Sequence, residues 1–276
     1  MSIPHLPAGL MKFEDAVYFD IDLPSSSTTK ALINGTNAHL AHEREQTREE
    51  NDAFTLGAYL HALLLAPPAT IENDFIKLGK IDRRTIAGKD LWAAAQRRAE
   101  LSGARIITAD LVEQGEAMAA SVRDHVNAST LLASLAHREI TIIGEIAGRH
   151  AKAKVDGIAT KRHSCLIVDI KTTESAAPKD FAASAAKFGY FHQAAFYRRL
   201  AEQQVSVVDD FLIIAVEKKA PYLTVIYRIP SVAMDIADEK IDALVERWWQ
   251  VNEGDRTGYP SSIQDLEPPR WWLANE

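Results

Sequence analysis

The spacing of hydrophobic and polar residues divides the chain into a helical first half and a strand-rich second half. The segment "ENDAFTLGAYLHALLLAPP" (50–68) repeats large apolar residues at helical spacing, and two consecutive prolines end it. Most of 70–136 continues as helix around the polar break "DRRTIAGKD". The pattern therefore predicts an N-terminal helical region over 51–136.

The period of the apolar residues changes to that of strands after residue 137. Three strand-like runs follow one another, "REITIIGEIAG", "AKAKVDGIA" and "SCLIVDIKT". One long helix is predicted over 181–204, then two strands in "DDFLIIAVEKK" and "PYLTVIYRIP", and a last helix over 232–251. This order predicts an α/β (α+β) fold, in which helices flank a mixed central sheet of about five strands.

The two ends of the chain are expected to be less regular. Residues 1–50 carry Ser and Thr capping signals before one helical pattern and are predicted to form a loosely structured N-terminal arm. Residues 253–276 are rich in proline and tryptophan and are predicted to form an irregular tail. Residues 51–276 are expected to form a single domain, made of the helical part at 51–136, a strand-rich core at 137–252 and that tail.

Composition limits the classes of protein that remain. With 276 residues, 47% of them hydrophobic, the chain can bury one large core or at most two small ones. No apolar run approaches the length of a membrane helix, and the N-terminus lacks a signal-peptide pattern. Cys165 is the only cysteine, which excludes an internal disulfide and fits a reducing cytoplasm.

The charge distribution is uneven. A formal net charge of −7 argues mildly against a polyanion binder. Between residues 77 and 105, however, basic side chains outnumber acidic ones, and they are Lys77, Lys80, Arg83, Arg84, Lys89, Arg97, Arg98 and Arg105. A local basic face can therefore exist on an acidic protein, although an ordinary solvated helix surface explains the same pattern.

Charged residues lie inside two apolar strands of "AKAKVDGIATKRHSCLIVDIKTT" (151–173). If this segment is a hairpin with its turn at the centre, Asp156 lies opposite Asp169. Because side chains alternate between the faces of a strand, Asp156, Asp169 and Lys171 then share one face with Lys154. The other face is apolar and is expected to pack on the core.

Two opposed carboxylates favour a bound cation. Directly opposed strand residues have Cβ atoms about 5 Å apart, so Asp156 and Asp169 would repel each other. A divalent cation between them removes the repulsion, because it takes oxygen ligands readily. Lys171 points at the same space, where an ammonium can stabilise developing negative charge. On this pattern alone, a solvent-facing sheet surface with ordinary ion pairs remains open as an alternative.

Four further residues can join such a site. Glu145 lies at the end of the preceding strand, and His61 lies in an otherwise apolar helix, where a neutral imidazole is a good metal ligand. Gln193 and Tyr197 are four residues apart and share a helix face, which suits contact with a substrate or a lysine. Each residue alone is also explained by an ordinary structural position.

Taken in order, these pieces resemble the PD-(D/E)XK nuclease superfamily in its RecB-like branch. The matching pieces are the histidine in "LGAYLHALLLAP", the acid in "GEIAG", "KVDG", the Asp-x-Lys of "VDIK" and the Gln-x-x-x-Tyr of "QAAFY". The chain is most similar to the exonuclease VIII (RecE-type) exodeoxyribonucleases, which "DRRTIAGKD" and "DLEPPRWW" also resemble. The resemblance covers roughly residues 20–275 and implies a restriction-endonuclease-like core.

The resemblance implies a role for each matching residue. Asp156 and Asp169 become metal ligands, and Lys171 becomes the catalytic lysine. Asp169 stands where many superfamily members carry glutamate. His61 becomes a metal-site histidine and Glu145 a further acid at the metal.

Two other pairs are expected to support the substrate. Gln193 and Tyr197 become the helix motif that supports the lysine or contacts DNA. Arg83 and Arg84 are the candidates for phosphate contacts.

The implied activity is Mg²⁺-dependent 5′-to-3′ hydrolysis of linear double-stranded DNA from its ends, with Mn²⁺ as a substitute, in phage-type recombination. The resemblance further implies a ring-shaped homo-oligomer, a single-strand annealing partner and the cytoplasm of a bacterial host. Two alternatives stay open: a non-catalytic module that binds DNA ends or a recombination partner, and an endonuclease of the same superfamily.

Overall fold

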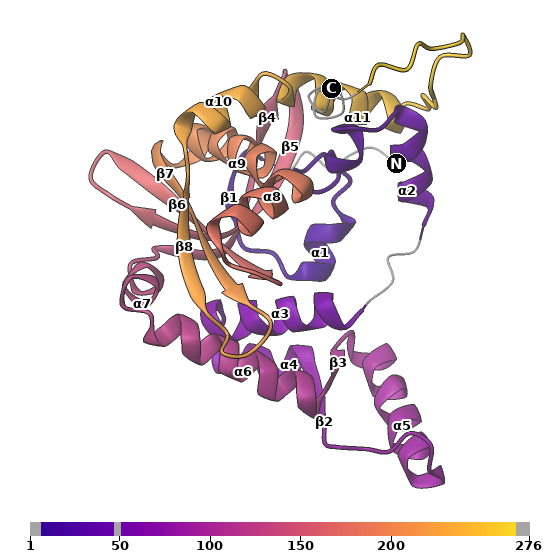
Figure 1. The fold of residues 1–276 in the computed structure, drawn as a ribbon, viewed down its shortest axis with the longest axis vertical. Coiled ribbons are helices and arrows are strands. Elements are labelled where there is room, and N and C mark those ends of the chain that lie inside the picture. The colour runs from indigo at the N-terminus through magenta and orange to yellow at the C-terminus, as the bar shows by residue number, and fades with distance from the viewer. Residues whose placement is uncertain (1–6, 47–50, 269–276) are drawn as a thin grey trace.

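A six-stranded mixed sheet forms the centre of the computed structural model, which describes residues 7–46 and 51–268 (Figure 1). Its spatial order is β1 (Gly9–Met11), β4 (His137–Ile146), β5 (Arg149–Thr160), β6 (Ser164–Thr173), β7 (Val207–Glu217) and β8 (Thr224–Ile229). Strands β6 and β7 are parallel, and the other neighbours are antiparallel. The five predicted strands are present, and the short β1 adds a sixth.

Helices cover both faces of this sheet (Figure 1). One face packs against α8 (Pro178–Phe188), α9 (Tyr190–Gln204), α10 (Ser231–Asp238) and α11 (Ile241–Asn252). The other packs against α3 (Asp52–Leu65), α6 (Ala109–Asp124) and α7 (Val126–Ala133). The predicted fold class, a mixed α/β sheet flanked by helices, is therefore confirmed.

A smaller unit extends from the helical side of the molecule (Figure 1). It contains α4 (Pro68–Asp74), β2 (Phe75–Leu78), α5 (Ile86–Ser102) and β3 (Arg105–Thr108), and β2 pairs with β3 in parallel. The prediction of helix through 70–136 missed these two strands. Each has four residues, too few for a period-2 pattern to stand out from the surrounding helices.

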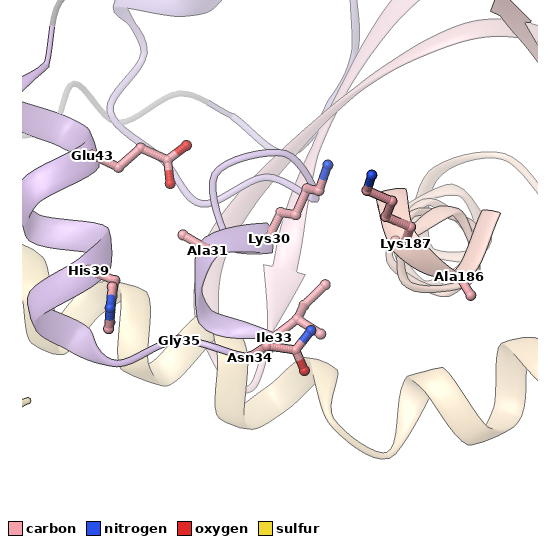
Figure 2. A pocket seen from close by; sticks show the side chains of 10 residues that line it. Lys30, Ala31, Ile33, Asn34, Gly35, His39, Glu43, Ala186 and Lys187 are labelled. Atoms are coloured by element: carbon pink, nitrogen blue, oxygen red, sulfur yellow. The ribbon is translucent and has the colours of Figure 1, made fainter. Parts of the chain in front are cut away.

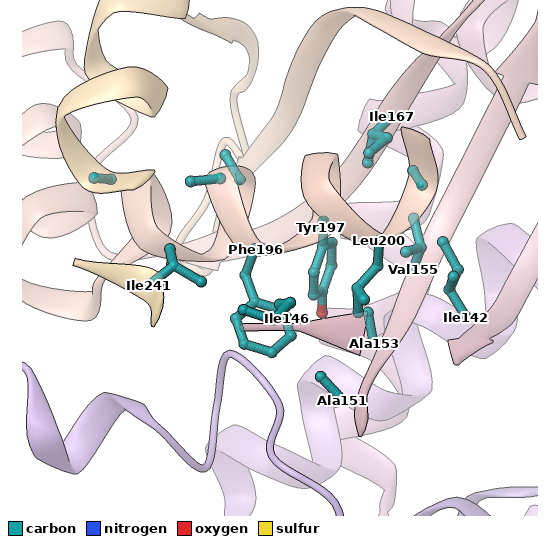
Figure 3. Packing of buried hydrophobic residues seen from close by; sticks show 14 of the residues in the cluster. Ile142, Ile146, Ala151, Ala153, Val155, Ile167, Phe196, Tyr197, Leu200 and Ile241 are labelled. Atoms are coloured by element: carbon teal, nitrogen blue, oxygen red, sulfur yellow. The ribbon is translucent and has the colours of Figure 1, made fainter. Parts of the chain in front are cut away.

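Helix α9 packs directly on the sheet and contributes several buried side chains to the main core. Figure 3 shows Phe196, Tyr197 and Leu200 on the side of α9 that meets Val155 and Ala153 of β5. Phe196 and Leu200 are buried at four-residue spacing, as expected for one helix stripe. The small side chains of Ala194, Ala195 and Ala201, each fully buried, let the helix approach the strands closely.

Two predicted long helices are each divided. The predicted helix over 181–204 is interrupted at Gly189, which ends α8 and precedes α9 with a left-handed φ of 72°. A glycine adopts this conformation without a steric penalty, which makes it a frequent helix terminator. The predicted helix over 232–251 is divided into α10 and α11, with Glu239 and Lys240 between them.

The hairpin formed by β5 and β6 is buried on both faces, which corrects the expected polar face. Ile158 and Ile167, predicted to lie beside the carboxylates, are fully buried in the cluster that includes α9. Ala159, Val168 and Ile170 lie in the opposite cluster with α3 and α6. The sequence of two strands that helices cover on both faces is apolar along most of its length.

The segment before residue 47 is more ordered than predicted. It contributes β1, α1 (Asp15–Asp20), a 3₁₀ turn at Lys30–Leu32 and α2 (Asn37–Glu45). Leu23, Leu32 and Leu40 are each at most 2% exposed and join the main core, so this is not a loose arm. Parts of the predicted arm (1–6 and 47–50) and the end of the predicted tail (269–276) lie outside the described residues.

Within the part of the chain that the structure describes, none of the helices combines the length and the hydrophobicity that a membrane crossing requires.

Candidate active site

The β5–β6 hairpin separates its strands at the two carboxylates. The predicted register is confirmed from Thr160–Cys165 to Gly157–Val168, where the backbone pairing ends. One step further, Asp156 and Asp169 do not pair through their backbones. Instead the Asp156 carboxylate accepts a hydrogen bond of 2.7 Å from the backbone N–H of Ile170. The Asp156 side chain thus replaces a backbone acceptor of the β ladder at this point.

Asp169 is held by two neighbours. Its Oδ1 accepts a hydrogen bond of 2.8 Å from Nε2 of Gln193, and its Oδ2 lies 2.5 Å from the ammonium nitrogen of Lys171. Burial, with the Asp169 side chain only 2% exposed, raises the pKa of this carboxyl to about 6 against the opposing effect of Lys171. Burial alone would lower the pKa of Lys171, but the Asp169 and Asp156 carboxylates raise it, so the lysine is a cation.

His61 reaches the other carboxylate from α3. Its Nδ1 lies 3.4 Å from Oδ1 of Asp156, and its Nε2 lies 3.1 Å from the backbone oxygen of Ile170. Burial opposes the charged imidazole, yet the Asp156 carboxylate outweighs it and raises the pKa of His61 to about 9. Burial likewise acts to raise the pKa of Asp156, but the charge of His61 lowers it. Both histidine nitrogens then carry protons, and Nε2–H donates to Ile170.

This donor set fits a hydrated divalent cation. Asp156, Asp169 and the Ile170 carbonyl supply oxygen ligands at the opening of the hairpin, whereas the protonated His61 contacts Asp156 and that carbonyl and has no free nitrogen for the metal. Oδ2 of Asp169 is buried without a hydrogen bond of good geometry and has only the Lys171 ammonium beside it. Among the described residues, no three His, Cys, Asp or Glu side chains form a complete metal cage. Mg²⁺ needs no such cage, because it keeps several waters and binds through one or two carboxylates.

The two members of the predicted helix motif contact different partners. Gln193 contacts Asp169, as described above, rather than the lysine. Tyr197 is buried, and its hydroxyl donates a 2.8 Å hydrogen bond to the backbone oxygen of Lys154 on β5. Tyr197 therefore fixes the strand that carries Asp156, and its hydroxyl is near enough to both carboxylates for their charges to act on it.

Sequence reasoning missed Tyr190, whose ring centroid lies 5.2 Å from the Lys171 ammonium nitrogen. An aromatic face at this distance stabilises a cation. Its three-residue spacing from Gln193, with both on α9, was the available signal.

Lys154, for which the sequence suggests no role, pairs with Asp15. Its ammonium forms a short ion pair with the Asp15 carboxylate at the start of α1, and Arg105 lies 3.5 Å from the same carboxylate. Although burial acts in the opposite direction, these cations lower the pKa of Asp15. Lys154 therefore ties β5 to the N-terminal segment.

Glu145 lies outside the site, which corrects the prediction that it binds the metal. It pairs with His150 at the far end of β5, and six residue steps of about 3.3 Å put it roughly 20 Å from Asp156. The β4 acid level with Asp156 is Glu139, which has a positive φ of 48°. Nothing in the alternation of the sequence distinguishes Glu139, because its unusual backbone depends on the folded sheet.

Arg83 and Arg84 are not brought to the carboxylates. Both precede α5 in the small extended unit, which Figure 1 places at the opposite end of the molecule from β5 and α9. The Arg83 guanidinium lies 4.6 Å from the ring centroid of Trp92, and Arg84 pairs with Asp82 at 3.0 Å. Their contact with DNA stays a prediction.

Comparisons with known proteins give one family and one similar fold. A family model described as "PDDEXK-like domain of unknown function (DUF3799)" matches residues 25–263. A crystal structure titled "Putative exonuclease" from Eubacterium rectale overlaps 96% of this chain and 98% of its own, with 15% sequence identity and a TM-score of 0.63. At that identity the similarity establishes the fold alone.

Two other solved structures are much less similar. SSO0001 has 14% identity and a TM-score of 0.30 over 79% of this chain and 85% of its own. VC1899 from Vibrio cholerae has 11% identity and a TM-score of 0.24 over 85% of this chain and 59% of its own. Scores this low carry no structural argument. The comparison with curated proteins gave no significant match.

Proposed function

The chain belongs to the family of PDDEXK-like domains of unknown function (DUF3799), and on that premise we propose that it is a metal-dependent exodeoxyribonuclease. The proposed substrate is linear double-stranded DNA, which the enzyme degrades from its ends in the 5′-to-3′ direction. The similarity to the fold of a protein titled an exonuclease supports the reaction class. Polarity, the annealing partner and a ring-shaped assembly rest on the resemblance to RecE-type enzymes.

One observation carries the proposal: two carboxylates, a backbone carbonyl and a lysine converge where the β5–β6 ladder opens. Asp156 and Asp169 bring two negative charges into a buried place, and they are compensated there by His61 and Lys171. Buried carboxylates with perturbed pKa values are costly for stability and are concentrated at functional sites. An ordinary sheet surface would expose these side chains, whereas Asp169 is 2% exposed.

The residues have distinct tasks in this proposal. Asp156, Asp169 and the Ile170 carbonyl would hold Mg²⁺, which supplies Lewis-acid chemistry and an activated water when bound. Lys171 places its ammonium beside the Asp169 carboxylate and stabilises the negative charge that develops on the scissile phosphate. Gln193 fixes the orientation of Asp169 through one hydrogen bond. Tyr197 fixes the backbone of β5.

The decisive experiment compares Asp169→Asn with Glu145→Gln in the full-length protein. Each change replaces a carboxylate by an amide of the same shape, but Glu145 lies outside the site. Digestion of end-labelled linear duplex in Mg²⁺ should fall about 10²–10³-fold or more in Asp169→Asn and should be unchanged in Glu145→Gln. Undiminished digestion by Asp169→Asn, with a normal thermal melt, would contradict the proposal.

A second arm separates exonuclease from endonuclease. Covalently closed circular duplex has no ends, so the proposed enzyme should leave it intact while it degrades the same DNA after linearisation. Products labelled at the 5′ or the 3′ end report polarity, because removal from the 5′ end releases a 5′ label first. Cleavage of the closed circle at a comparable rate would refute the exonuclease assignment while retaining the nuclease.

A further inference from the structure

An exposed aromatic side chain lies between two lysines beside the site. Phe188, at the end of α8, is 45% exposed. The ammonium nitrogen of Lys30 lies 5.1 Å from its ring centroid, and that of Lys187 lies 5.6 Å away. Lys30 comes from the N-terminal 3₁₀ turn, so two distant parts of the sequence meet here. Within residues 7–46 and 51–268, neither lysine forms an ion pair with a carboxylate.

The lysines share a pocket of about 440 Å³. Figure 2 shows their ammonium ends directed toward the same space, with Ile33 and Asn34 below and Glu43 on the far side. Two ammonium groups that face one space repel each other, and a bound anion removes that repulsion. The pocket volume lies within the range of about 300–1,000 Å³ that is typical of sites for small ligands.

Gly189 determines the position of the neighbouring Phe188. Its φ of 72° ends α8 and starts α9 at the next residue. A Cβ at this position would lie 3.3 Å from Cδ1 of Ile33, so the space is filled by that neighbour. The break therefore places Phe188 at the surface and Tyr190 at the site, on consecutive helices.

A continuous row of contacts joins this surface to the chemistry. The rings of Phe188 and Tyr190 stack with centroids 6.1 Å apart, and the Tyr190 centroid lies 5.2 Å from the Lys171 ammonium nitrogen. A DNA strand rises about 3.4 Å per nucleotide, so Phe188 lies about three nucleotides from a phosphate held at Lys171.

We propose that Phe188, Lys30 and Lys187 bind one nucleotide of a single DNA strand, about three nucleotides from the scissile phosphate. The base stacks on the Phe188 ring, and its phosphate lies between the two ammonium groups. Single-strand binding sites combine these two elements, because every base has a stacking face and every nucleotide has a negative charge. This inference rests on the proposed nuclease function.

The test measures binding of a fluorescent single-stranded oligo-dT to the full-length protein in EDTA, where no cleavage occurs. Phe188→Ala should weaken binding about 5- to 150-fold, the loss expected for one stacked base. Phe188→Tyr should restore wild-type binding, whereas Phe188→Leu, which keeps the apolar surface without a ring, should not. Phe188 is exposed, so a thermal melt should show that each variant folds.

Charge is tested separately by salt dependence. Lys30→Gln with Lys187→Gln should reduce the slope of log affinity against log salt by about 0.7, the value for one single-strand phosphate contact. Lys179→Gln, an exposed lysine of the same helix outside this pocket, is the matched control and should not change the slope. An unchanged slope in the double variant would overturn the phosphate contact.

Outcomes for this surface and for the nuclease are distinguishable. Binding within twofold of wild type in Phe188→Ala, or equal binding by Phe188→Leu and wild type, would overturn the stacking site even if the protein digests DNA. Conversely, Phe188-dependent binding by a protein that digests no DNA in Mg²⁺ would support the site and refute the enzyme. Equal losses for duplex and single-stranded probes would overturn the single-strand assignment.

Discussion

Replacing Gln193 by alanine tests whether this side chain positions Asp169 for a metal. The change removes the 2.8 Å hydrogen bond to Oδ1 of Asp169 and leaves the carboxylate with Lys171 at Oδ2. A hydrogen bond to a charged group contributes about 1.5–3 kcal/mol net. At 1.4 kcal/mol per factor of ten, affinity for Mg²⁺ should fall about 10- to 150-fold. This range agrees with the roughly 10–100-fold cost of losing groups that orient metal ligands.

The assay titrates Mg²⁺ against the initial rate of duplex digestion and, independently, Mn²⁺ binding by calorimetry. Gln193→Ala should shift both half-saturation points to higher metal concentration, and saturating metal should recover most of the rate. A group that touches only substrate would instead change the rate at saturating metal and leave Mn²⁺ binding unchanged.

Gln203→Ala is the matched control. Gln203 lies on the same helix and also hydrogen-bonds a strand, but through the backbone of Glu145 at the far end of the sheet. It should leave both titrations unchanged. The reasoning is refuted if Gln193→Ala binds Mn²⁺ as wild type does, or if Gln203→Ala shows the same shift.

Three further predictions concern single residues. Lys171→Met should lower the rate of digestion at saturating Mg²⁺ about 10²–10³-fold and retain duplex binding in EDTA; wild-type turnover would contradict its role. Tyr197→Phe should lower the free energy of unfolding in urea by about 1–3 kcal/mol, because the buried Lys154 carbonyl loses a donor, and should change digestion much less; an unaltered midpoint would contradict this. Asp15→Asn should destabilise the protein at neutral pH, and the difference from wild type should shrink as pH falls from about 4 through the lowered folded-state pKa, because the carboxyl stabilises the fold only while it is ionised. A difference that is as large at pH about 3 as at neutral pH would exclude the ion pairs as its cause.

A central turn was sufficient to predict the register of the hairpin. Placing the turn in the middle of 151–173 gives the register that the structure has from Thr160–Cys165 to Gly157–Val168. The same register put Asp156 and Asp169 at neighbouring positions. Strand period is a local property of the backbone, so it can be read without knowing what covers the sheet.

The two helices predicted after residue 180 were correct in position, but each was predicted to be continuous. Two predicted helices are each divided, one at the left-handed Gly189. A glycine inside a helical pattern is compatible with either a continuous or a broken helix, and the choice depends on packing. Here the neighbouring Ile33 fills the space that a side chain would need.

Which candidate residues form the site could be determined only from the tertiary structure. Glu145 and His61 were both candidate partners for Asp156 in the sequence, yet only His61 lies within contact distance. Strand direction carries Glu145 about 20 Å away, while the packing of α3 against the sheet brings His61 in from a position 95 residues earlier in the chain. Lys154 likewise finds its partner, Asp15, in a segment that was expected to be loose.

The sequence by itself therefore determined which chemical groups the strands present and in what order, because period and spacing are properties of neighbouring residues. Only the tertiary structure decided that Asp156 contacts His61, that Gln193 supports Asp169, and that Lys30 stands over Phe188. These contacts depend on which helix covers which face of the sheet. That arrangement is fixed by burial summed over the whole core, to which each residue adds only a small part.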